Sequence, residues 1–335
     1  MKFRWCVIGA GGIADRRVMP AMLKEKGFEL VALCDRMPEK AERLGAKYAV
    51  KFYTDEETML RENPCDGVYI ASPVALHLPQ ALTALRYGCN VLLEKPIAMN
   101  AEEGERLAAA FRREKKTLSV GYMMKFHNLH AMAKKMIRDG EIGRVGTVRF
   151  FFACWYPDLA GAWRQEKALG GGGSVMDLGV HCIELAEFLL GEEITEAKGY
   201  LATRTFSYEV EDTGAFLFRT AGGVIGSVET GFNVPDACAS RLEIYGSEGS
   251  VICEGTLGQE EKGKLTLLRA PQGEYDAMQT RGVVKSERYY GAGGDLFRKE
   301  LRRFAQRVRE KAFDEESERA VRVQRIVDGI YNEKR

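Results

Sequence analysis

Short apolar runs alternate with helix-like segments over the first 120 residues, and this alternation restricts the possible folds more than any other feature. The runs carry few charges, as strands buried on both faces of a sheet do. They are Phe3–Ile8, Leu30–Cys34, Gly67–Ala71, Val91–Glu94 and Leu118–Val120. Between them, helices are predicted over Glu39–Lys47, Leu78–Tyr87 and Ala101–Lys116, the last with a capping box that starts at Asn100. Strand–helix alternation predicts a parallel, doubly wound α/β sheet.

The rest of the chain is predicted to form a different kind of sheet. After Gly121 several β-like runs alternate polar and apolar residues, with hairpin turns at Ala221–Gly223 and Gly246–Gly249. The runs are Val145–Cys154, Ala197–Thr205, Thr213–Phe218, Val224–Phe232, Ser240–Tyr245 and Ser250–Cys253. The predicted helices are Asn128–Asp139, Val175–Leu190, Asp295–Arg309 and Glu318–Tyr331, with Ser317 as N-cap of the last. We therefore expect a domain over residues 1–122 and a second, α+β domain over residues 123–335, with an antiparallel sheet covered on one face.

Composition and charge exclude several classes of partner. A formal net charge of +1 provides no general attraction for nucleic acid or an anionic membrane. The arginine-rich stretch 298–309 has Leu301 and Phe304 on one helical face, so its charges are interpreted as a solvated surface. Neither a signal peptide nor an apolar run of about 18 to 20 residues is present, so a cytoplasmic protein is expected. The eight cysteines are scattered without a CxxC pair, which predicts reduced thiols and no metal site.

A glycine-rich turn directly follows the first predicted strand. Gly9-Ala-Gly11-Gly12-Ile13-Ala14 matches the GxGxxG/A pattern, in which the glycines allow a tight turn and close approach of a pyrophosphate. The second strand ends at Asp35, about 20 residues on, where a carboxylate can bind the ribose hydroxyls of adenosine. Arg36 could hold a 2′-phosphate, stack on adenine or be an ordinary surface residue. Because Asp35 should repel that phosphate, the pattern favours NAD as the cofactor and still allows NADP.

Two further groups of residues can carry proton chemistry. Glu94-Lys95-Pro96 ends a predicted strand, at the edge where open α/β sheets bind ligands. Lys95 could stabilise an alkoxide-like oxygen there, or could simply be a solvated lysine. Asp177 and His181 stand four residues apart in a predicted helix, a spacing that suits a carboxylate orienting an imidazole base. The glycines at 170–173 just before them form a loop that can lie close against a ligand.

Taken together, these motifs resemble those of the glucose–fructose oxidoreductase / inositol dehydrogenase / MocA family in order and spacing. The resemblance rests on Gly9–Ala14, Ser72-Pro73 with His77, Glu94-Lys95-Pro96 and the glycine-rich segment 171–181. It implies a Rossmann domain joined to an α/β domain whose large open sheet often mediates oligomerisation. It also implies hydride transfer between NAD(P) and a sugar or cyclitol carbon.

The same resemblance implies roles for individual residues. Lys95, Asp177 and His181 occupy the positions of the catalytic residues of that family. The cofactor contacts that it implies are Ser72, Pro73, His77, Glu94 and Lys95, with Trp163-Arg164 near the nicotinamide.

The sequence departs from this family at two places. Ser72-Pro73-Val74 replaces a common Thr-Pro-Asn, and Met123-Met124-Lys125-Phe126 replaces a segment that commonly contains arginine or glutamine. Both changes affect substrate identity more than reaction type. We therefore expect an NAD(P)-dependent oxidoreductase acting on a secondary alcohol or ketone of a neutral, sugar-like molecule, assembled as a homodimer or homotetramer.

The motifs are also compatible with two alternative functions. One is a trans-dihydrodiol dehydrogenase, or an anhydrosugar or aldose-type reductase of the same fold. Another is a non-catalytic dinucleotide-binding regulator, which would be expected to lose Lys95 or His181, whereas this chain has both.

Overall fold

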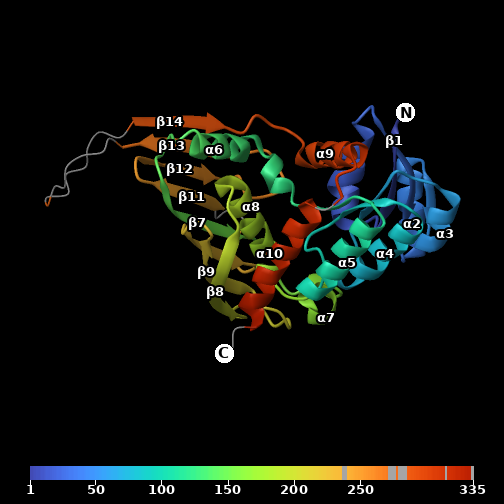
Figure 1. Cartoon of the computed structure of the whole chain (residues 1–335). Coiled ribbons are helices and arrows are strands. Elements are labelled where there is room, and N and C mark those ends of the chain that lie inside the picture. The colour runs from blue at the N-terminus through green and yellow to red at the C-terminus, as the bar shows by residue number, and fades with distance from the viewer. Residues whose placement is uncertain (236–239, 271–276, 278–284, 314, 333–335) are drawn as a thin grey trace. The chain divides into compact units, whose positions relative to one another are not determined.

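The computed structural model describes residues 1–235, 240–270, 277, 285–313 and 315–332, and the chain divides into two compact units (Figure 1). The first unit comprises Met1–Tyr122, Glu166–Gly171 and Phe297–Arg325. The second comprises Met123–Gln165, Gly172–Leu296 and Ile326–Arg335.

The first unit is built on a six-stranded sheet with the strand order β3-β2-β1-β4-β5-β6. Its strands are β1 (Phe3–Ile8), β2 (Phe28–Cys34), β3 (Lys51–Tyr53), β4 (Gly67–Ile70), β5 (Asn90–Leu93) and β6 (Leu118–Val120). Every neighbouring pair is parallel, which confirms the predicted doubly wound sheet. The strand order reverses between β1 and β4, and ligands bind at such switch points in open α/β sheets.

Helices of the first unit follow most of its strands. They are α1 (Met19–Leu23), α2 (Pro38–Tyr48), α3 (Glu56–Glu62), α4 (His77–Arg86), α5 (Ala101–Arg113), α7 (Lys167–Gly170), α9 (Leu296–Glu310) and residues 315–325 of α10 (Glu315–Asn332). The cap of α5 forms as predicted, since Asn100 Oδ1 accepts a hydrogen bond of 2.9 Å from the Glu103 N–H. The prediction of Ser317 as an N-cap is wrong. The helix α10 begins at Glu315, because acidic residues in its first turn complement the helix dipole, and Ser317 is fully buried inside it.

The second unit is built on an eight-stranded sheet with the order β14-β13-β12-β11-β7-β10-β9-β8. Its strands are β7 (Val145–Ala153), β8 (Ile194–Ala202), β9 (Thr213–Thr220), β10 (Ile225–Gly231), β11 (Arg241–Gly246), β12 (Gly249–Glu254), β13 (Lys264–Arg269) and β14 (Lys285–Tyr290). All pairs are antiparallel except β7 with β10, which confirms the mostly antiparallel sheet. Both predicted hairpins form, between β9 and β10 and between β11 and β12.

One face of this second sheet is covered by helices. The helices α6 (Asn128–Arg138) and α8 (Val180–Leu190) pack on each other and on the sheet (Figure 1). Along β9 every second residue is buried, so the covered face forms the core of this unit. The predicted helix over 175–190 begins with a wide π-helical turn, Val175–Gly179, before it continues as α8.

The described part of the chain contains seven free cysteines, and Cys238 lies outside the described residues. Among the described residues there is no cluster of histidine, cysteine and carboxylate side chains suited to a metal ion. Nor do they include a helix with the length and apolar character needed to cross a membrane.

Candidate functional site

The first glycine-rich segment forms the turn between β1 and the next helical segment. Gly9 has a φ of +73°, and a Cβ there would lie 2.7 Å from the Ser72 backbone nitrogen after β4. Gly12 has a φ of +53°, and no atom lies within 4 Å of the place that its Cβ would occupy. Ala14 is fully buried and begins a π-helical turn, Ala14–Val18. The turn therefore needs glycine at both positions and leaves open space beside the backbone of Gly12, as a phosphate cradle requires.

Asp35 follows β2 as predicted, but it has a charged partner that the sequence analysis missed. Its Oδ2 forms a 2.7 Å ion pair with Nζ of Lys40 from α2, and its Oδ1 accepts a hydrogen bond from the Met37 N–H. The Lys40 side chain extends over the glycine turn, because a Cβ on Gly11 would lie 2.2 Å from the same ammonium nitrogen. The carboxylate is therefore neutralised, and its expected repulsion of a 2′-phosphate is weakened. Arg36, beside it in sequence, is exposed.

Ser72 and His77 connect the end of β4 to the loop after β5. The His77 ring nitrogens lie 2.9 Å from the Pro96 carbonyl oxygen and 3.1 Å from that of Ser72. The ring is 1% exposed, and this burial lowers the pKa of His77 to about 4. A neutral imidazole has one N–H and can donate to only one of these two carbonyl oxygens, and with this lowered pKa it is a poor proton carrier near neutral pH.

Glu94 and Lys95 follow β5 at the same edge of the parallel sheet. The Tyr69 hydroxyl donates a 2.5 Å hydrogen bond to Glu94 Oε1, and burial raises the pKa of Tyr69 well above its usual value. The Lys95 N–H donates to Glu94 Oε2, and Lys95 is only partly buried. The first unit thus gathers Gly9, Ser72, His77 and the Glu94-Lys95 pair at the carboxyl ends of β1, β4 and β5.

A second group of predicted site residues lies in the second unit. Arg164 belongs to a short 3₁₀ turn, and its guanidinium stacks on the Trp163 ring at 4.2 Å from the ring centroid. Its Nε donates a 3.2 Å hydrogen bond to Oδ1 of Asp177, which lies in the π-helical turn. Both residues were expected at the site, but their ion pair was not predicted.

His181 lies in the first turn of α8, four residues after Asp177. It is 4% exposed, and its ring makes an edge-to-face type contact with Phe152 on β7, with 6.4 Å between the ring centroids. One turn further along α8, Glu184 forms a buried ion pair with Lys125, from one of the segments that depart from the family pattern. Buried charges need such pairing. No sequence pattern indicated Glu184 as the partner of Lys125.

The predicted site residues thus fall into two groups, one in each unit. The group in the first unit comprises the glycine turn, Asp35, Ser72, His77 and Lys95, and the group in the second comprises Trp163-Arg164, Asp177 and His181. The joint action of Lys95 with Asp177 and His181 stays a prediction.

Comparison with known proteins identifies relatives of the whole chain. Residues 3–122 match the model of an oxidoreductase family with an NAD-binding Rossmann fold, and residues 130–252 match the GFO/IDH/MocA C-terminal domain. The chain is 32% identical over 273 residues to 1,5-anhydro-D-fructose reductase of Ensifer adhaerens, which covers 80% of each chain. It is 27% identical over 286 residues to the NAD(+)-dependent scyllo-inositol 2-dehydrogenase of Bacillus subtilis, covering 83% of this chain and 81% of that one.

A solved structure of an oxidoreductase also resembles this chain over nearly its whole length. KijD10, a 3-ketoreductase from Actinomadura kijaniata in complex with NADP and TDP-benzene, has a TM-score of 0.84 to this chain. The two sequences are 26% identical, and the match covers 99% of this chain and 97% of the other.

Proposed function

Because the chain belongs to the GFO/IDH/MocA oxidoreductase family and is an NAD(P)-dependent oxidoreductase, we propose that it transfers a hydride to or from a secondary carbon of a neutral, sugar-like substrate. The observation that supports this most directly is that the chain has both a turn suited to bind a dinucleotide and residues suited to transfer a proton. The glycine turn of the first unit has the backbone conformation and open space of a phosphate cradle. The second unit carries a buried histidine on the same helical segment as a partly buried aspartate.

In the proposed reaction the nicotinamide, when bound, supplies or accepts the hydride, and the protein moves the proton. His181 acts as the acid or base at the substrate oxygen, since a positioned imidazole can accept a proton from a reacting hydroxyl or return one to it. The Lys95 ammonium stabilises negative charge that develops on that oxygen. Asp177 holds its place through the ion pair with Arg164, and it favours the protonated form of a nearby imidazole.

The charges around the second group of residues favour a neutral substrate. Arg164 is paired with Asp177 and Lys125 with Glu184, so both cations are already balanced by carboxylates. A phosphorylated sugar would require an arginine cluster available to its phosphate. The proposed substrate is therefore a polyhydroxylated ring, such as a ketose, a cyclitol or a glycoside.

A turnover screen tests the function. The purified protein is incubated with NADH or NADPH and 1,5-anhydro-D-fructose, inosose or 3-keto-glucoside, and in the reverse direction with NAD or NADP and the alcohols. Each sugar is offered with and without a phosphate group. We expect turnover of at least one neutral substrate. Failure of all of them, with intact dinucleotide binding, would favour a binding regulator instead, and faster turnover of the phosphorylated forms would contradict the neutral-substrate proposal.

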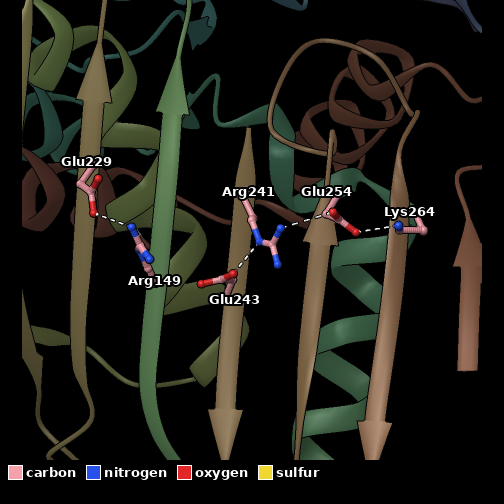
Figure 2. A network of polar contacts seen from close by, with 6 residues as sticks. All are labelled: Arg149, Glu229, Arg241, Glu243, Glu254 and Lys264. Carbon is pink, nitrogen blue, oxygen red and sulfur yellow. Dashed lines mark hydrogen bonds and ion pairs between the residues drawn. The ribbon is translucent and has the colours of Figure 1, made fainter. Parts of the chain in front are cut away.

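The open face of the second sheet supports the proposal of a homodimer or homotetramer. Ion pairs cross the middle of this face, from Glu229 to Arg149 and from Glu243 through Arg241 and Glu254 to Lys264 (Figure 2). Large apolar side chains are exposed on the same face, because the pairing of the strands places them on the side of the sheet that carries these ion pairs. They are Tyr200, Leu217, Ile225, Tyr245 and Tyr290.

Exposed apolar side chains that gather on one face of a sheet are typical of an interface between protein surfaces. On β10 itself the only exposed large apolar side chain of the described residues is Ile225, so most of the apolar surface comes from neighbouring strands. The test is light scattering at micromolar concentration on Leu217→Arg, with Leu23→Arg in the first unit as the control. A wild-type monomer would contradict the proposal. A cytoplasmic location is also proposed, and cell fractionation tests it.

A further inference from the structure

A single buried residue holds the start of the helical segment that carries Asp177 and His181. Glu211 is 7% exposed, and it accepts hydrogen bonds from three consecutive backbone N–H groups of this segment. Its Oε2 accepts from Gly173 at 2.9 Å, its Oε1 from Val175 at 2.9 Å, and its backbone carbonyl from Ser174 at 3.0 Å. The first N–H groups of a helix have no partner within the helix, so these bonds replace the missing ones.

The carboxylate is fixed in turn by the last turn of α10. The Tyr331 hydroxyl donates a 2.6 Å hydrogen bond to Glu211 Oε1. Burial raises the pKa of Glu211, whereas the bonds from Tyr331, Val175 and Gly173 act to lower it. These donors carry no full charge, and the positive end of the helical segment 175–190 is what complements the carboxylate.

Two of the four glycines before the helix are explained by this contact. A Cβ on Gly172 would lie 2.1 Å from the Tyr331 hydroxyl oxygen, and one on Gly173 would lie 1.9 Å from the Glu211 carbonyl oxygen. From the sequence, this run was interpreted as a loop that a ligand can approach closely. In the structure, Gly172 and Gly173 instead make room for Tyr331 and Glu211.

We call the hydrogen bonds from residues 173–175 to Glu211 the anchor, and Gly173 connects this anchor to Asp177. The Gly173 N–H binds Glu211, and the Gly173 carbonyl accepts a 2.9 Å hydrogen bond from the Asp177 N–H. Ser174 adds a 3.0 Å hydroxyl contact to Thr230 on β10. A displacement of Gly173 therefore moves the Asp177 backbone directly, and with it the turn that leads to His181.

We propose that Glu211, held by Tyr331, is a positioning residue for hydride transfer, which sets the location of Asp177 and His181 and contacts no reactant itself. The proposal rests on the proposed function, because it assigns Glu211 a role through those two residues. Misplacement by about 1 Å of groups that act in a transition state can reduce the rate about 100-fold, so the anchor should affect turnover more than binding.

Two variants test it, with a matched control. Tyr331→Phe removes only the hydroxyl that binds Glu211, and Glu211→Gln places an NH₂ group opposite a backbone N–H. Tyr289→Phe removes a tyrosine–glutamate hydrogen bond of the same 2.6 Å length on the edge strand β14. We expect kcat to fall about 5- to 30-fold in Tyr331→Phe and further in Glu211→Gln. KM and the dinucleotide Kd should stay within about threefold of wild type, and Tyr289→Phe should match wild type.

Amide hydrogen exchange, measured without substrate, separates this proposal from the proposed function. The amides of residues 173–175 should exchange faster in both variants and not in Tyr289→Phe. Unchanged exchange there would overturn the anchor, and faster exchange with unchanged kcat would show a purely structural contact. If Glu211→Gln does not fold, Tyr331→Phe alone decides between these outcomes. If the wild type turns over none of the substrates, the proposed function fails and the positioning role fails with it, whereas the exchange data still report whether the anchor exists.

Discussion

Replacement of Lys40 by methionine should shift dinucleotide preference away from NADP. Methionine keeps most of the side-chain length over Gly11 and removes the ammonium that lies 2.7 Å from Asp35. The carboxylate is then uncompensated at the place where the adenosine ribose is expected to bind. A 2′-phosphate in NADP would lose an attraction and meet a repulsion, whereas NAD carries no charge at that position.

The magnitude follows from the exposure of the pair. Two unit charges about 4 Å apart interact by about 1 kcal/mol in water and by about 4 kcal/mol near a protein surface. The Lys40 side chain is 32% exposed and Asp35 is 5% exposed, so the energy of a charge interaction at this position lies between these two values. After discounting for screening we expect about 1 to 2 kcal/mol, which corresponds to about a 5- to 30-fold increase in the NADP Kd. The Kd of NAD should change by less than about threefold.

Calorimetric titration with both dinucleotides measures these changes, at low and at moderate salt. Lys47→Met is the matched control, because Lys47 lies on the same helix and pairs with a different carboxylate, Asp15. If Lys40→Met weakened NAD and NADP equally, the ammonium would serve the fold or the pyrophosphate, and the reasoning about the ribose would be wrong. Tighter NADP binding by the wild type would also contradict the preference for NAD that Asp35 predicts.

Three further predictions follow from the two site groups. His181→Ala should lower kcat by about 10²- to 10⁴-fold and Lys95→Ala by at least as much, with small changes in dinucleotide Kd; a near-normal kcat in steady-state assays would refute either role. Gly9→Ala should abolish dinucleotide binding, because its Cβ would lie 2.7 Å from a backbone nitrogen, whereas Gly27→Ala, with open space around it, should bind normally in the same titration. The pKa of His77 is about 4 in the folded protein and 6.5 in the unfolded chain, so the unfolded chain binds a proton first as the pH falls. The contribution of His77 to the free energy of unfolding is therefore complete above pH 6.5 and decreases by up to about 3 kcal/mol as the pH falls toward 4. Urea unfolding should show this loss, and a His77→Asn variant with the same pH dependence would contradict the assignment.

Most strands could be predicted from the sequence, including the edge strand β6, whereas β3, β13 and β14 could not. The prediction for β1 has the observed bounds, because five of the six residues of this central parallel strand are apolar and buried. The strands β3 and β14 were missed, and each lies at an edge of its sheet with mostly exposed residues. These two strands carry charged and polar side chains, so their sequences resemble those of loops. The alternation of buried leucines in β13 was a usable signal.

Residues of the candidate site differ from their interaction partners in how far the sequence indicates them. The sequence proposes Gly9, Asp35, Lys95, Asp177 and His181 as site residues, because each lies in a short pattern that is interpreted from the adjacent strand or helix. The partners of these residues could not be predicted, because they come from other elements of the fold. Arg164 precedes Asp177 by 13 residues, and Glu211 follows Gly173 by 38. Among these partners only Lys40 could have been predicted from the sequence, since it lies close to Asp35, in the first turn of the helix that begins at Pro38.

The two glycine-rich segments show why a glycine pattern alone does not identify a binding loop. Both lead into a π-helical turn, a feature that is frequent at functional sites. Near Gly12 the space that a side chain would fill is open, so a ligand can approach the backbone there. Near Gly172 and Gly173 that space is filled by Tyr331 and Glu211, so the glycines are required by the protein's own packing. Alanine at Gly12 should therefore impair dinucleotide binding, whereas alanine at Gly173 should displace Asp177 and reduce turnover with the dinucleotide still bound.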